Sequence, residues 1–128
     1  MREKLKLVER QIDKQVKKKN VTSMNYLNAA EESDKINIIQ LKGEVLEGET
    51  LQDLISQTGS IQEGESLVVE IASPGGSVAE GLEIMMWLEQ LSKQGVQIIT
   101  VVTANAYSIA SLIMLAADIR LISRHAKV

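Results

Sequence analysis

The sequence predicts a single α/β domain built on a parallel sheet, and three observations indicate this fold class. Two short runs, residues 67–72 and 96–103, are nearly continuously apolar and rich in Ile and Val, as is typical of strands buried on both faces of a parallel sheet. Helical patterns separate these runs from one another. Strands and helices therefore alternate along the chain, an order that favours parallel pairing through right-handed crossovers.

The first half of the predicted domain contains two strands and a short helix. Residues 36–41 form a run rich in Ile that ends at a polar, glycine-containing segment, which predicts a strand. Thr50 and Asp53 have the spacing of a capping box, and Gly59 is placed to end the short helix over residues 51–58. The run over residues 67–72 predicts a second, buried strand.

The second half repeats the alternation. Ser77 and Glu80 form a second capping box, which predicts a helix over residues 78–93 that ends before Gly95. A buried strand follows over residues 96–103. The last two predicted elements are a buried helix over residues 106–117, which is small and apolar with few β-branched positions, and a short strand over residues 119–122.

The composition is that of one folded domain. The chain has 128 residues, of which 45% are hydrophobic, 24% charged and only 2% aromatic, and this length suits one domain with a sizeable core. No cysteine is present, which excludes disulfides, thiolate metal sites and a cysteine nucleophile. We expect no metal and no other cofactor. Asp118, for example, has no second carboxylate or His at a metal-ligand spacing.

No secretory signal or membrane-spanning segment is visible. Residues 1–20 alternate charged and apolar positions, and the longest nearly apolar stretch, residues 106–117, is too short to cross a bilayer. We therefore expect a cytoplasmic protein without a membrane partner.

Charge is distributed unevenly along the chain. Residues 1–20 hold eight Lys and Arg against three Asp and Glu, a net charge of +5, so the remaining residues hold six against fourteen, a net charge of −8. The acidic remainder lacks basic patches interleaved with aromatic residues. We therefore expect no nucleic-acid partner, and we interpret the basic run as a solvated charged segment.

The basic segment also has a helical pattern. Its apolar residues recur at steps of three and four, at Leu5, Val8, Ile12 and Val16. We predict three regions: a basic amphipathic helical arm over residues 1–20, a linker over residues 21–35, and the folded domain over residues 36–128.

The first candidate site is the turn Ser73-Pro74-Gly75-Gly76-Ser77, between a predicted strand and a predicted helix. The carboxyl ends of strands are where open α/β sheets bind their ligands. Gly75 and Gly76 allow backbone N–H groups to face outward with no Cβ in the way. Two interpretations stay open, an anion or oxyanion site and a tight turn that only needs flexible residues.

The second candidate site is Ser108, where the next strand gives way to the predicted buried helix. A Ser in this place is either a helix N-cap or a nucleophile. As a nucleophile, Ser108 would need an oxyanion site, which the Ile109 amide and a Gly75 or Gly76 amide could form. The spacing alone does not decide between these functions.

Both turns resemble motifs of a known family. Residues 71–78 read Ile-Ala-Ser-Pro-Gly-Gly-Ser-Val, residues 106–112 read Ala-Tyr-Ser-Ile-Ala-Ser-Leu, and residues 116–118 read Ala-Ala-Asp. These motifs, in this order, are similar to those of the Clp-type serine proteases, and most similar to the phage-encoded head-maturation branch. The resemblance covers roughly residues 36–128.

The resemblance implies a fold, an activity and partners. The expected fold is the crotonase-like ββα spiral that Clp proteases share with crotonases and signal-peptide peptidase A. The expected activity is cleavage of polypeptide substrates by a serine endopeptidase, with Ser108 as the nucleophile and the amides at Gly76 and Ile109 as the oxyanion hole. The expected assembly is a homo-oligomeric ring, with an ATP-dependent unfoldase or capsid assembly proteins as possible partners.

The general base is missing from the matched motifs. In the family, the base is a His that follows a strand expected to begin at about Lys127, so the chain is expected to be truncated before it and inactive alone. The one histidine, His125, precedes that position, and we interpret it as a surface turn residue.

Two alternatives stay open at this stage. An acyl-CoA enzyme of the crotonase type would use the same paired amides to hold a thioester enolate and would not need Ser108. An inactive ring-assembly or scaffold subunit would explain the missing base, together with Ala104 and Tyr107, which replace the Gly and the small Ala usual in the family.

Overall fold

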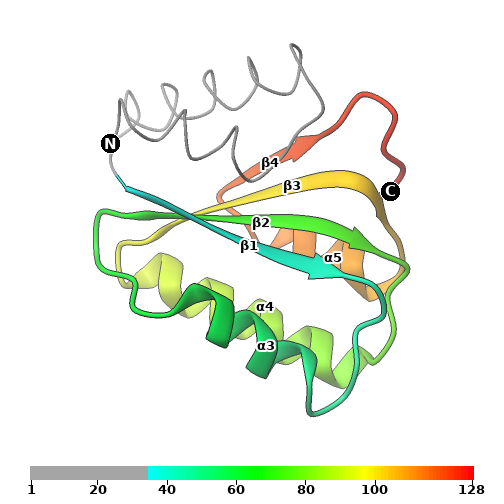
Figure 1. Ribbon diagram of the computed structural model, residues 1–128, viewed down its shortest axis with the longest axis horizontal. Coiled ribbons are helices and arrows are strands. Elements are labelled where there is room, and N and C mark those ends of the chain that lie inside the picture. The colour runs from blue at the N-terminus through cyan, green and yellow to red at the C-terminus, as the bar shows by residue number, and fades with distance from the viewer. Residues whose placement is uncertain (1–34) are drawn as a thin grey trace.

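The computed structural model describes residues 35–128. The predicted helical arm, residues 1–20, and nearly all of the linker predicted at residues 21–35 lie outside this described part. Its four strands and three helices alternate along the chain (Figure 1). The elements, in order, are β1 (Ile36–Lys42), α3 (Thr50–Thr58), β2 (Ser66–Ser73), α4 (Val78–Lys93), β3 (Gln97–Ala106), α5 (Ile109–Leu115) and β4 (Ile119–Ile122).

The four strands form one sheet in the order β1-β2-β3-β4, and every neighbouring pair is parallel. Each crossover contains one helix, as is usual for parallel strands. The predicted fold class, a mixed α/β domain with a parallel sheet, is therefore confirmed. Because all strands run the same way, the carboxyl ends of β1, β2 and β3 meet at one edge of the sheet (Figure 1).

The main core lies between the sheet and the three helices. Leu67, Val69 and Ile71 alternate along β2 and face this core. It also contains Leu54 of α3, Ile84 and Leu88 of α4, and Ile109, Ala110, Ile113 and Met114 of α5. A smaller apolar cluster, with Val68 from β2, occupies the opposite face. Burying each such side chain contributes roughly 1.5–3 kcal/mol, so packing fixes the position of the sheet edge.

The boundary between β3 and α5 differs from the prediction. The sequence predicted a helix from Ala106, but β3 continues to Ala106 and α5 spans only Ile109–Leu115. The reason is long-range pairing. The Ala106 N–H donates to the Lys127 carbonyl at 2.9 Å and the Tyr107 N–H donates to the Ser73 carbonyl at 3.1 Å, so neighbouring segments extend the strand where local propensity favours a helix.

The two predicted capping boxes have different outcomes. Ser77 caps α4, because its Oγ accepts from the Glu80 N–H at 3.2 Å. The prediction for Thr50 is wrong, since α3 already includes Thr50 and its Oγ1 accepts from the Leu46 N–H at 2.7 Å. Glu49, at the N-cap position of α3, makes no side-chain capping bond.

Over residues 35–128, no helix is long and apolar enough to cross a membrane.

Candidate active site

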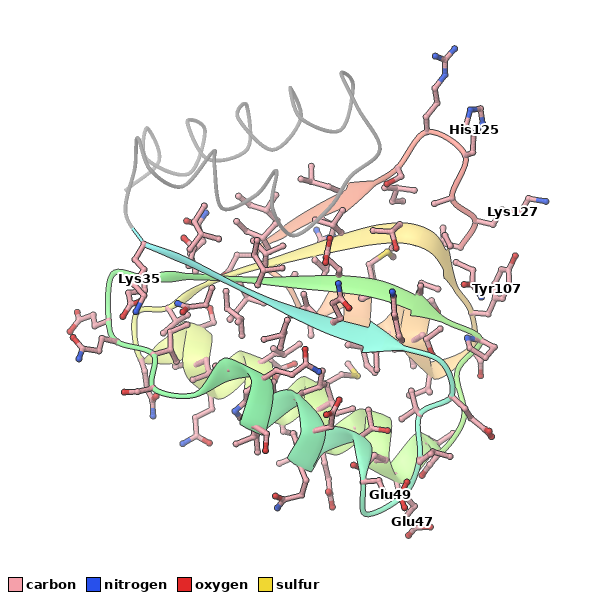
Figure 2. All side chains as sticks on the ribbon, in the orientation of Figure 1. Lys35, Glu47, Glu49, Tyr107, His125 and Lys127 are labelled. Carbon is pink, nitrogen blue, oxygen red and sulfur yellow. The ribbon has the colours of Figure 1, made fainter. Side chains whose placement is uncertain are left out.

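Two strand-to-helix turns meet at the carboxyl edge of the sheet. One joins β2 to α4 through residues 74–77, and the other joins β3 to α5 through Tyr107 and Ser108. The Tyr107 N–H donates to the carbonyl of Ser73, the last residue of β2. This bond holds the two turns side by side, and Figure 2 shows Tyr107 at the same edge of the molecule.

Gly75 lies directly against the second turn. A Cβ built on Gly75 would lie 2.8 Å from the Ser108 Cβ, 2.8 Å from the Tyr107 carbonyl oxygen and 3.4 Å from the Ile109 nitrogen. The backbone of Gly75 also has φ +100°, a conformation that L residues rarely adopt. Only glycine therefore allows the β2–α4 turn to lie directly against Ser108.

Ser108 has an unusual backbone. Its φ of 54° makes it the one non-glycine residue of positive φ within residues 35–128, and a conformation of this kind costs about 1–3 kcal/mol. Its side chain is exposed, and although Ser108 occupies the N-cap position of α5, it makes no side-chain capping bond. The geometry therefore does not support the interpretation of Ser108 as only a helix cap.

In the two turns, the backbone N–H groups of Gly76 and Ile109 have no acceptor among residues 35–128. The Gly75 N–H is different, because it donates to the Ser73 Oγ at 3.1 Å. The Ile109 side chain is buried against Gly81 of α4, where an added Cβ would overlap it. Packing thus holds Ile109 in place, while its N–H has no acceptor in the described part of the chain.

The comparison with known families identifies the domain. The sequence profile of the Clp protease family matches residues 38–128. The chain belongs to the Clp protease family. None of the curated proteins compared matches it. Family membership indicates a peptidase, and the four-stranded parallel sheet with its helices agrees with a Clp/crotonase-like fold.

Sequence reasoning missed one component of this candidate site, the segment of residues 43–49 that follows β1. We call it the Val45 loop. The Val45 N–H donates to the Gly75 carbonyl at 2.8 Å, and the Val45 carbonyl accepts from the Ser77 N–H at 2.8 Å. A Cβ on Gly76 would overlap the Val45 carbonyl oxygen. The only sequence signal for this contact is Gly76 itself, because the partner lies about thirty residues away along the chain.

His125 does not pair with Ser108. It lies in an exposed turn after β4, and Figure 2 shows its ring pointing away from the sheet. Within residues 35–128, no hydrogen bond joins His125 to Ser108. The prediction that His125 is a surface turn residue is confirmed. Two residues later, Lys127 forms a parallel bridge with Asn105 near the end of β3.

Two carboxylates of the domain, those of Asp118 and Glu65, have structural partners. Asp118 accepts from the Ile98 N–H at 2.8 Å and from the Ser92 hydroxyl at 3.0 Å, which ties the end of α5 to the start of β3. Among residues 35–128, no three His, Asp or Glu side chains are grouped so that they could hold a metal ion. A hydrogen bond from Asn37 lowers the pKa of Glu65, at the opposite edge of the sheet from Ser108.

Proposed function

We propose that this protein is a serine endopeptidase of the Clp type, in which Ser108 is the nucleophile and the amides of Gly76 and Ile109 form the oxyanion hole. The observation that carries the proposal is the contact of Gly75 with Ser108. It places an exposed serine, held in a strained backbone, against the turn that contains Gly76, and the N–H groups of Gly76 and Ile109 have no acceptor among residues 35–128. The N–H of Gly75 already donates to the Ser73 Oγ. The role of Gly75 is therefore to leave room for Ser108, because it has no side chain.

The proposed chemistry is acyl transfer to serine. The Ser108 Oγ forms a bond to the carbonyl carbon of the substrate while its proton passes to a general base, and the carbonyl oxygen becomes an anion. The two amides donate to this oxyanion, which is usually worth about 10²–10³ in rate per donor. The C–N bond then breaks, the amine leaves with the proton from the base, and water hydrolyses the acyl-enzyme.

We propose that the general base follows the segment that begins at Lys127. The parallel bridge between Lys127 and Asn105 supports this location. It places the segment at Lys127 alongside Asn105, which is three residues before Ser108 in the sequence. His125 is exposed and its ring points away from the sheet. A base must lie within hydrogen-bond reach of the serine, or be connected to it through one water.

Hydrolysis of an unfolded protein tests the proposal. The complete gene product, with any residues that its gene encodes beyond this sequence, should cleave casein, and Ser108→Ala should lower the rate at least about 10³-fold. Ser60→Ala is the matched control, because Ser60 is an exposed serine in the loop after α3. Cleavage that survives in Ser108→Ala would contradict the proposal.

An acyl-CoA enzyme is the second candidate on the same site, because paired amides also hold thioester enolates. The exposure and backbone strain of Ser108 favour the protease, since enolate chemistry does not require a serine there. Saturable coenzyme A binding that is unchanged in Ser108→Ala would favour the acyl-CoA enzyme instead.

We also propose that the domain assembles into a homo-oligomeric ring in the cytoplasm. An exposed apolar stripe on α4 supports assembly, because Val78, Leu82 and Met86 repeat every four residues and are 59%, 47% and 68% exposed. The motifs resemble the phage head-maturation branch, which suggests capsid or scaffold proteins as substrates. An ATP-dependent unfoldase is the alternative partner.

A further inference from the structure

Glu80 is a buried carboxylate that has no part in the chemistry described above. It lies in the first turn of α4 and is only 4% exposed. Among residues 35–128, no Lys or Arg forms an ion pair with it. A buried carboxylate without a cation needs hydrogen-bond donors, since burial of an unpaired charge is costly.

The donors to Glu80 are two backbone amides from a different part of the chain. The Gly48 N–H donates to Oε1 at 3.0 Å and the Leu51 N–H donates to Oε2 at 2.8 Å. Gly48 belongs to the Val45 loop, and Leu51 is the second residue of α3. Because the N-cap residue Glu49 makes no capping bond, Glu80 supplies the acceptor that the first turn of α3 needs. One carboxylate therefore fixes both the Val45 loop and the start of α3 to α4.

The Val45 loop in turn sets the direction of the Gly76 amide. The Gly75 carbonyl and the Gly76 N–H belong to one planar trans peptide group, so they point in opposite directions. The Val45 N–H donates to the Gly75 carbonyl at 2.8 Å, and the Val45 carbonyl accepts from the Ser77 N–H, the amide that follows Gly76. The Gly76 N–H must therefore point away from the Val45 loop, and it has no acceptor among residues 35–128.

We infer that Glu80 is a positioning residue for the oxyanion hole, which holds the Gly76 amide in its orientation through the Val45 loop. The inference rests on the proposed function only in calling that amide an oxyanion donor. The path from Glu80 to Gly48, Val45 and Gly75 consists of hydrogen bonds and chain connections in the described residues. Loss of the carboxylate should make the Gly76 amide more mobile, although Glu80 itself does not contact the substrate.

Hydrogen exchange and steady-state kinetics of Glu80→Gln test this inference in the complete gene product. A Gln keeps one acceptor oxygen but places an NH₂ against the other backbone N–H. Amide exchange should therefore rise at least tenfold in residues 43–51 and also in residues 74–78. Peptidase kcat should fall about ten- to a hundredfold while KM changes less than twofold, as expected when a donor acts mainly in the transition state.

Three further variants separate positioning from general destabilisation. Glu83→Gln, at an exposed position three residues after Glu80 in α4, should change neither amide exchange nor kcat. Thr58→Val removes a buried hydrogen bond to Leu54, and it should lower the melting temperature but keep kcat. Glu80→Asp keeps the charge on a shorter side chain, so its kcat should lie between those of the wild type and Glu80→Gln.

Two results would overturn the inference. One is faster exchange in residues 43–51 with unchanged exchange in residues 74–78, which would make Glu80 a local anchor only. The other is a loss of kcat in Thr58→Val as large as that in Glu80→Gln, when the two variants lose the same amount of melting temperature. Failure of the proposed function has a different signature, because it appears as full hydrolysis in Ser108→Ala while the exchange results still decide whether Glu80 controls the Gly76 turn.

Discussion

Gly75 and Ser108 show how two residues at separate turns depend on each other. Ser108 exposes its hydroxyl because its backbone adopts a positive φ, and this strain must be held by neighbouring contacts. Gly75 supplies one such contact, since its Cα lies against the Ser108 side chain and the Tyr107 carbonyl. The sequence indicated both residues as site candidates, but a positive φ at a serine has no local sequence signal.

At the residue scale, Gly75→Ala should inactivate the enzyme. The added Cβ would collide with Ser108 and Tyr107 and would strain a φ of +100°. We expect a loss of about 2 kcal/mol in the free energy of unfolding and a fall in kcat of about a hundredfold or more. Thermal unfolding and casein cleavage measure the two effects.

Gly59→Ala is the control for this variant. Gly59 has φ +62°, but nothing lies within 4 Å of an added Cβ, so the substitution introduces backbone strain without a collision. Activity should stay at the wild-type level. Equal losses of activity in the two variants would show that the contact with Ser108 is not the cause.

At the element scale, the order and type of the seven elements in residues 35–128 were predictable because their local patterns are strong. The central parts of β2 and β3 are rich in Ile and Val, and α4 has a cap at Ser77 that the structure confirms. Errors occurred where distant residues override local preference. The carbonyl of Lys127 extends β3 to Ala106, and α3 takes its cap from Glu80 on another helix. Neither partner is visible in a local window of sequence.

The pairing of β1 with β2 has a pH-dependent component at Glu65. Its carboxylate accepts from Asn37 at 3.1 Å and from the Gln62 N–H at 3.1 Å, and Lys35 lies 3.7 Å away. The Asn37 hydrogen bond is the main cause that lowers the Glu65 pKa in the folded state. A lowered folded pKa contributes stability above the unfolded pKa of about 4.3, and that contribution is lost as the pH falls through the folded pKa.

Glu65→Gln should therefore destabilise the domain at pH 7 and have a smaller effect at low pH. The difference in melting temperature between wild type and Glu65→Gln should be constant above about pH 5.5 and shrink as the pH falls below about 4. Glu89→Gln, at an exposed position of α4, is the control. A difference that stays constant from pH 7 to pH 3 would rule out this contribution.

At the scale of the whole molecule, the three helices of residues 35–128 cover one face of the sheet, and an exposed apolar stripe runs along α4. Val78, Leu82 and Met86 lie along this outer side, in the helix that follows the glycine turn. An assembly that covers this stripe would therefore contact the same helix that Ser77 caps and that contains Glu80. The family resemblance implied a ring, but the exposed stripe that we propose as its contact surface required the structure, because exposure is a property of the folded molecule.

Leu82→Lys should weaken the proposed assembly. A charge in the centre of the stripe would have to be desolvated on association, so the molecular mass measured by light scattering should fall toward that of the monomer. Ile55→Lys, at a position 41% exposed on α3, is the matched control and should keep the wild-type mass. The same mass for Leu82→Lys and the wild type would exclude this stripe as the contact.

The central claim is that Ser108 is an activated nucleophile beside its oxyanion hole. A fluorophosphonate probe, followed by peptide mass mapping of the complete gene product, tests it most directly. The predicted result is one covalent adduct on Ser108, absent in Ser108→Ala and strongly reduced in Gly75→Ala. An adduct on another residue, an adduct that persists in Ser108→Ala, or no adduct on a protein that cleaves casein would contradict it.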